Sequence, residues 1–219
     1  MKSFVFLTAA FAVCFAQAGV VLITSEGDLG TNDTINWSQL GPEFTMLTGP
    51  QAVSSAGGIS ATVSTAGGPL ERRNQGTSWA GNFFTGDPLL WQKSGADITL
   101  TFATAVSGVG AQIQDDFFGS FTARIIGIGG DVLGTFTQEG NSNSNRDGSA
   151  IFIGLLSDTQ NISSVVFNVD SNDFAIGTVS LNTLGGVPVG EVPEPVSIAL
   201  FGLGSLGIAL SRRSKRKQA

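Results

Sequence analysis

Apolar and polar residues alternate through much of the stretch between residues 19 and 194, and helical periodicity is hard to find there. In residues 98–102 the apolar side chains share one face and the two threonines take the other, and residues 109–113 repeat the pattern. Alternating or mostly apolar runs predict seven further strands, at residues 20–24, 59–64, 121–128, 132–137, 150–155, 162–169 and 174–181.

The last predicted strand changes phase part of the way along. Phe174 and Ile176 would share one face, whereas Val179 and Leu181 are out of phase with them. An extra residue inserted into one strand of a pair shifts the alternation in this way, and glycine is common at such positions. We therefore expect a β-bulge at Gly177.

Clusters of Gly, Asn and Asp separate the predicted strands at short intervals, which favours antiparallel pairing over βαβ units. Nine or ten strands within residues 19–190 predict an all-β fold, an antiparallel β-sandwich of jelly-roll type. A closed barrel is the alternative.

The composition excludes several classes of function. The chain has 219 residues, 30 of them glycine, but no histidine, no tyrosine and one cysteine. Without histidine there is no Ser-His-Asp or Cys-His catalysis, no His-ligated zinc and no imidazole pH switch. We expect a protein that is not an enzyme.

Charge is unevenly distributed along the chain. Residues 19–194 hold all 17 acidic residues and 5 of the 11 basic ones, a formal charge of −12. A strongly acidic body repels polyanions, so a nucleic-acid partner is excluded.

The first 18 residues have the pattern of a secretory signal peptide. Lys2 supplies the positive start, residues 4–16 are apolar, and Ala16-Gln17-Ala18 provides small residues for cleavage. Cleavage after Ala18 would remove Cys14, the one cysteine, so the exported protein would contain no disulfide.

The C-terminal segment, residues 191–219, has three parts in a fixed order. Val192-Pro193-Glu194-Pro195 breaks any preceding strand, and an uncharged run over residues 196–210 follows it. That run is short for a membrane helix, about 22 Å against a hydrocarbon core of about 30 Å. Five cations end the segment and should stay on the cytoplasmic side: Arg212, Arg213, Lys215, Arg216 and Lys217.

This arrangement resembles the PEP-CTERM sorting signal: a Pro-Glu-Pro motif, a short membrane helix and a basic terminus. The resemblance implies recognition by an exosortase, a transpeptidase-like membrane enzyme of Gram-negative bacteria that make extracellular polysaccharide. It implies that Val192, Pro193, Glu194 and Pro195 form the sorting motif, and that the five cations form a retention tail. A plain membrane anchor is the alternative.

Parts of the body also resemble ectodomains of exosortase-sorted surface proteins. The similar stretches are residues 81–90, 108–114 and 174–176. This weaker resemblance implies a fold more than a function, because such ectodomains mostly have no assigned ligand.

Aromatic residues are dense in one stretch that is also rich in Asn, Gln, Gly and Thr. Sugar rings stack on exposed aromatic side chains while amides bind their hydroxyls. Carbohydrate contact is therefore a hypothesis for Trp79, Phe83, Phe84 and Trp91. The alternative is that these rings fill the core of the sandwich.

Three further patterns are weaker. Residues 143–148 fit the start of a calcium loop, but its twelfth position is Gly154 rather than Glu, so a polar hairpin is the better interpretation. A calcium site formed by carboxylates far apart in the sequence is the alternative, with Glu26, Asp28, Asp170 and Asp173 as candidates. Adjacent Asp115 and Asp116 would point to opposite faces of a strand, unlike a glycosidase pair.

A glycine pattern at residues 202–207 fits a nucleotide-binding loop by letter, but no strand precedes it. The sequence thus predicts a signal peptide (1–18), a β-sandwich ectodomain (19–190) and a sorting segment (191–219). The protein would pass through the inner membrane to the cell surface or matrix, with no cofactor or metal. A polysaccharide-binding module is the alternative function, and a carboxylate glycosidase a more distant one.

Overall fold

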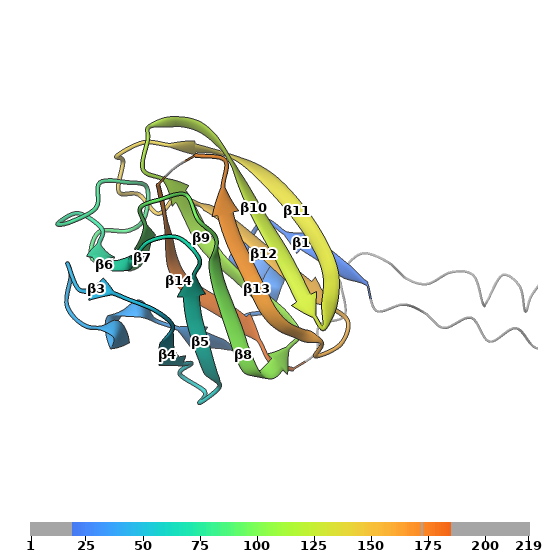
Figure 1. Cartoon of the computed structure of the whole chain (residues 1–219). Coiled ribbons are helices and arrows are strands. Elements are labelled where there is room, and N and C mark those ends of the chain that lie inside the picture. The colour runs from blue at the N-terminus through green and yellow to red at the C-terminus, as the bar shows by residue number, and fades with distance from the viewer. Residues whose placement is uncertain (1–18, 172, 185–219) are drawn as a thin grey trace, which may run out of the picture. The chain divides into compact units, whose positions relative to one another are not determined.

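Two antiparallel β-sheets face each other across a shared core in the computed structural model, which describes residues 19–171 and 173–184 (Figure 1). This confirms the prediction of an all-β antiparallel sandwich. Both sheets are open, with an edge strand at each side, so the described residues do not form a closed barrel.

The larger sheet has eight strands, and the last strand in chain order among the described residues is one of its central strands. Its order is β1 (Val20–Ile23), β12 (Ile151–Ser157), β9 (Gly108–Asp115), β14 (Phe174–Asn182), β7 (Pro88–Gln92), β6 (Leu70–Asn74) and β3 (Met46–Leu47), with β2 (Asp33–Ile35) also beside β14.

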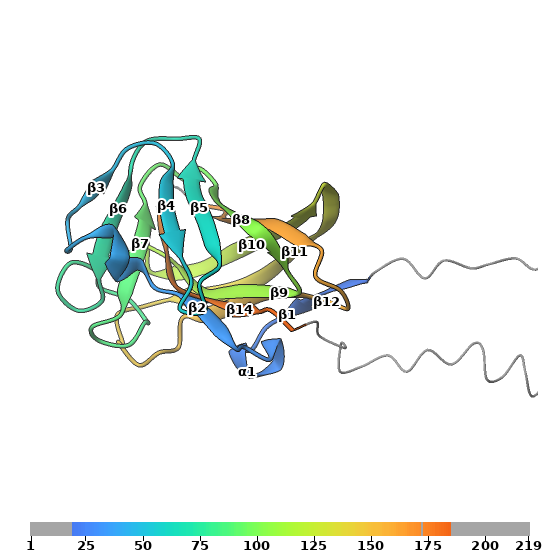
Figure 2. The same ribbon diagram turned by 90° about the horizontal axis from the view of Figure 1, so that it is seen from below.

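The second sheet has six strands and lies in front of the first in Figure 1. Its order is β11 (Asp131–Ser142), β10 (Gly119–Gly129), β13 (Ile162–Val169), β8 (Ile98–Val106), β5 (Ser60–Thr65) and β4 (Gln51–Ser54). Two short helices, α1 (Glu26–Leu29) and the 3-10 helix η1 (Trp37–Leu40), lie in the N-terminal part, and Figure 2 shows α1 projecting from the eight-stranded sheet.

Every strand predicted from alternation is present, but the expected number of strands is wrong. The described residues contain 14 strands, because β2, β3, β4, β6 and β7 were not predicted. These strands are two to five residues long, and they are too short, or in β6 too highly charged, for alternation to show.

The bulge predicted at Gly177 is confirmed. The register between β14 and β9 shifts between Ile176 and Val179. On its other side β14 pairs with β7 before the bulge and with β2 after it. The carbonyl oxygen of Gly177 accepts a hydrogen bond of 2.7 Å from the indole Nε1 of Trp37, which is fully buried.

The main core lies between the two sheets and is built from the inward residues of each. Leu100, Ile125 and Phe167 come from the six-stranded sheet, and Leu90 and Ile113 from the eight-stranded one. All five are essentially inaccessible to solvent. Burial of these apolar side chains is the main stabilising contribution that the fold provides.

A buried carboxylate attaches the turn between β4 and β5 to β2. Asp33 accepts hydrogen bonds at Oδ1 from the backbone N–H groups of Gly57 (2.7 Å) and Thr34 (2.8 Å), and at Oδ2 from the hydroxyl of Ser55. Burial alone would raise the pKa of Asp33, but these hydrogen bonds favour the charged form and lower its pKa below the usual value.

We expect the contribution of Asp33 to stability to disappear at acid pH. Its folded pKa lies below the unfolded one, so the unfolded state binds more protons as pH falls below about 4. Stability should therefore be complete above the unfolded pKa and lost as pH falls through the folded value. Urea unfolding between pH 2.5 and 7 should show Asp33→Asn destabilised at pH 7, with the difference from the parent narrowing as pH falls toward 2.5. The exposed Asp131→Asn serves as control, and a pH-independent difference would contradict the expectation.

Candidate functional site

The outer face of the eight-stranded sheet, which points away from the main core, is covered at two separate places. The loops over residues 75–87 and 143–150 cover one part and enclose a second apolar cluster: Trp79, Phe83, Leu89, Trp91, Ala150 and Ala175. Helix α1 covers the other part, where Leu29 packs with Phe152 and Leu156. The two covers therefore bury different parts of this face.

The structure brings together three of the four aromatic residues proposed for carbohydrate contact. Trp79 and Trp91 meet edge to face, with ring centroids 6.2 Å apart and planes at 64°. Their exposed fractions are 6% and 7%, and Phe83 is fully buried. Phe84 differs from them, because 59% of it is exposed. Of this set, only Phe84 presents a ring to a ligand without movement of the loops.

A network of buried and half-buried amides holds the two covering loops to the sheet. Gln114 on β9 accepts a hydrogen bond at Oε1 from the backbone N–H of Asn82 (2.6 Å) and donates from Nε2 to Asn82 Oδ1 (2.9 Å). The backbone N–H of Asn143 donates to the same Oδ1 at 2.7 Å. Gln112 donates from Nε2 to the carbonyl oxygens of Gly148 (2.7 Å) and Ala150 (3.0 Å).

Close packing explains two glycines of residues 81–90 and 108–114, one beside the amide network and one beside Phe152 in the cluster under α1. A Cβ atom on Gly81 would lie 2.4 Å from Gln114 Oε1, and one on Gly110 would lie 2.5 Å from the Phe152 ring. Neither position has room for a side chain, since real Cβ contacts essentially never fall below 3.0 Å. These two glycines thus allow the close packing of the two covers on the sheet, which is a structural role.

The largest of the three hollows, of about 540 Å³, lies at the edge of the sandwich beside the start of β12, between α1 and the covering loops, and Gln138 of β11 in the other sheet also lines it. Strand β1 pairs with β12 only over Gly154–Ser157. Among the described strands, none therefore pairs with the start of β12 on the edge opposite β9. Gln112 and Phe152 sit opposite each other in the β9–β12 register, and both line the hollow. The hollow is also lined by Thr24, Ser25, Glu26, Phe84 and Gln138.

A smaller hollow of about 90 Å³ lies near Trp79 and Trp91, with Arg73 and Asp116 in its wall. The Arg73 guanidinium lies 4.2 Å from the centroid of the Trp91 ring and 4.9 Å from that of Phe44, and it forms a 2.7 Å ion pair with Glu71. Asp116 is exposed overall, but partial desolvation of its carboxylate raises its pKa, the Asp115 carboxylate raises it further, and Arg73 opposes both effects. This hollow is too small for more than a few ligand atoms.

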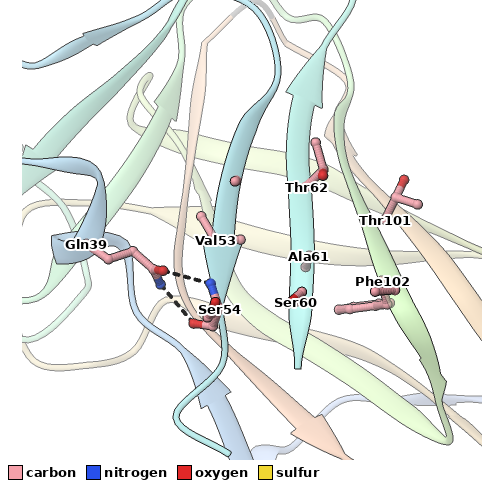
Figure 3. Close-up of a pocket in the computed structure, with 10 residues that line it drawn as sticks. Gln39, Val53, Ser54, Ser60, Ala61, Thr62, Thr101 and Phe102 are labelled. Carbon is pink, nitrogen blue, oxygen red and sulfur yellow. Dashed lines mark hydrogen bonds between the residues drawn. The ribbon is translucent and has the colours of Figure 1, made fainter. Parts of the chain in front are cut away.

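A third hollow, of about 390 Å³, lies over β4, β5 and β8 (Figure 3). Its exposed lining includes the hydroxyls of Ser54, Ser60 and Thr62. The amide of Gln39 pairs with the edge of β4, accepting from Ser54 N (2.7 Å) and donating to Ser54 O (3.0 Å), as the dashed lines in Figure 3 show. It thus covers part of an edge strand, a common protection against unwanted pairing.

Three of the acidic residues considered for calcium or hydrolysis lie near one another at the end of β9. The Asp116 N–H donates to the Asp173 carbonyl oxygen (3.0 Å), and burial, then the Asp116 and Asp115 carboxylates, raise the pKa of Asp173, against the effect of Lys93. Strand β9 ends at Asp115, which is buried, while Asp116 beyond it is exposed. Among residues 19–171 and 173–184, no three His, Cys, Asp or Glu side chains are placed to hold a metal ion. Each of the three hollows has at most one carboxylate in its lining.

The expectation that residues 143–148 form a hairpin loop is wrong. They connect β11 to β12, which belong to different sheets, so the chain crosses here from one layer of the sandwich to the other. Asp147 accepts hydrogen bonds at Oδ1 from the N–H (3.1 Å) and the hydroxyl (2.5 Å) of Ser149. Its carboxylate thus stabilises the loop internally.

The predicted signal peptide, sorting motif, membrane helix and basic tail lie outside the described residues. Within the part that the structure does describe, no helix is both long and apolar enough to span a bilayer.

Comparison with known proteins bears on the C-terminal segment. A family model described as the PEP-CTERM protein-sorting motif matches residues 191–213. The chain therefore carries a PEP-CTERM sorting motif, which confirms the resemblance based on the Pro-Glu-Pro segment. Such a motif implies export and exosortase processing.

Comparison with curated proteins finds no match. Among solved structures the chain is similar to CsCBM6-3 from Clostridium stercorarium, solved in complex with cellobiose. The two are 14% identical, with a TM-score of 0.22, and the likeness covers 74% of this chain and 93% of that one.

Proposed function

We propose that this protein is an exported, non-catalytic β-sandwich, delivered to the cell surface or extracellular matrix after an exosortase processes its C-terminal segment. The PEP-CTERM motif at residues 191–213 is the observation that carries the proposal. The chemistry is thus done to this protein, at or near Val192, Pro193, Glu194 and Pro195, and its partners are the exosortase and the membrane.

The charge distribution supports the same route. Residues 19–194 carry a formal charge of −12, whereas the last eight residues carry five cations and no acidic side chain. Basic segments next to a membrane span stay on the cytoplasmic side, so Arg212, Arg213, Lys215, Arg216 and Lys217 retain the chain while its acidic body lies outside. The uncharged run over residues 196–210 then serves as a temporary anchor until the body is released.

Replacing Pro193-Glu194-Pro195 by three alanines should stop this processing. We expect nearly all of the protein to remain as the longer, membrane-associated form on an immunoblot of fractionated cells. The matched control changes Val187-Pro188-Val189 to alanines, which removes a nearby proline but leaves the motif intact, and it should mature normally. A normal mature band from the motif variant would refute the proposal, and cells without their exosortase should reproduce its unprocessed form.

Carbohydrate binding by the body is a second candidate function. It is supported by the exposed Phe84 ring at the wall of a 540 Å³ hollow that also contains amide, hydroxyl and carboxylate groups. A surface location would bring the body into contact with extracellular polysaccharide. Because Trp79 and Trp91 are buried, alanine variants at those positions would perturb packing as well as any ligand contact.

A further inference from the structure

We infer that the hollow between α1 and the covering loops binds an uncharged saccharide, with Phe84 as the surface on which a sugar ring stacks. This inference rests on the second candidate function and assigns it a location and a ligand class.

Hydrogen bonds fix the Phe84 backbone, and packing against Gly148 positions its ring, before any ligand arrives. The backbone N–H of Phe84 donates to Asp87 Oδ2 (2.9 Å), and the N–H of Asp87 donates back to the Phe84 carbonyl oxygen (3.0 Å). The ring lies against Gly148, where an added Cβ would come within 2.2 Å of the ring Cζ atom. Gly148 is itself fixed by the hydrogen bond from Gln112. A pre-ordered aromatic ring lowers the entropy that binding would otherwise cost.

Polar groups suited to sugar hydroxyls line the same hollow. Ser25 is the residue before α1, yet its side chain makes no capping hydrogen bond, so its hydroxyl is not used by the helix. Gln138 Oε1 is shielded from solvent and accepts no hydrogen bond within the described residues. Unmet buried acceptors are uncommon in folded proteins, and a ligand hydroxyl would satisfy this one if the side chain turned toward the hollow.

The charge of the lining selects the class of ligand. Glu26 is the one charged side chain that lines the hollow, and no basic residue does. A uronate or sulfated sugar would bring its negative charge next to Glu26 without a cation to balance it. A neutral sugar meets no such penalty, since Glu26 can accept hydrogen bonds from hydroxyl groups while Oε1 keeps its 2.5 Å bond from Ser180.

Affinity electrophoresis and titration of the full chain in detergent test this assignment. The neutral probes are dextran, β-glucan and galactomannan, and the anionic probes are alginate and hyaluronate. We expect retention by at least one neutral polymer and by neither anionic one. Phe84→Ala should weaken that retention about tenfold or more, as the loss of one stacking ring implies. Gln138→Leu should weaken it less, about threefold to tenfold.

The matched control is Phe117→Ala, which removes another exposed ring (62% exposed) that does not line the hollow. It should bind like the parent, and thermal unfolding should confirm that all variants are folded. Equal retention by alginate, or neutral retention that Phe84→Ala leaves unchanged, would overturn this assignment but not carbohydrate binding itself. If no polymer retains the folded parent, both this assignment and carbohydrate binding by the protein are refuted.

Discussion

Replacing Trp37 by alanine should lower the free energy of unfolding by about 3–5 kcal/mol, the range seen when a large aromatic side chain is removed from a core. Trp37 is completely buried and packs in the main core between the sheets. Its indole N–H also satisfies the Gly177 carbonyl at the bulge of β14, at 2.7 Å. Alanine would leave both a cavity and a buried acceptor without its partner.

Two further variants separate these contributions in urea or thermal unfolding. Trp37→Phe keeps most of the apolar contact but removes the donor, so we expect a loss of about 2 kcal/mol. Phe118→Ala removes an exposed ring and should change stability by about 0.5 kcal/mol or less. A Trp37→Ala loss no larger than that of Phe118→Ala would show that the bulge does not depend on Trp37.

The body has no covalent support for its fold, which makes such core contacts important. The one cysteine of the chain, Cys14, lies in the predicted signal peptide, and no residue after it is cysteine. An exported protein without disulfides depends on noncovalent interactions alone.

The sequence pattern predicts strands best where one face of a strand meets the core along several residues. The strand predicted at residues 162–169 has those bounds in the structure, and the phase change at Gly177 marks a real bulge. Strand β6 was missed because its pattern is dominated by charge. Arg72 is nevertheless buried there, since its guanidinium donates to Asn74 Oδ1 (2.6 Å) and the Leu89 carbonyl oxygen (3.2 Å). Those partners depend on tertiary contacts that alternation cannot show.

The candidate binding site was only partly predictable for the same reason. Composition identified the aromatic stretch, but Phe83 and Phe84 are adjacent in a loop, and no local pattern tells which ring is buried. The hollow takes its side chains from segments as distant as Ser25 and Gln138. Gln112 and Gln114 alternate with apolar residues like ordinary outward polar residues, yet both bind loops that cover the sheet.

Replacing Gln114 by leucine should release those loops, at a cost of about 2–4 kcal/mol in the free energy of unfolding. Leucine has a similar size but cannot accept from the Asn82 N–H or donate to Asn82 Oδ1, and these polar groups are buried. Hydrogen exchange should therefore accelerate in residues 75–87 and 143–150, while β10 and β13 in the other sheet keep their protection.

Gln160→Leu is the matched control, because Gln160 is exposed and should change neither stability nor exchange in the loops appreciably. The double variant Asn82→Leu with Gln114→Leu gives the sharper comparison. Since the two amides bind each other, the combined loss should fall short of the sum of the single losses by about 0.5–3 kcal/mol. Additive losses, or loops that exchange no faster than in the parent, would mean that the covering loops are held by the Trp79 and Trp91 cluster instead. In that case Phe84 would keep its position without the amide network, and saccharide retention would survive Gln114→Leu.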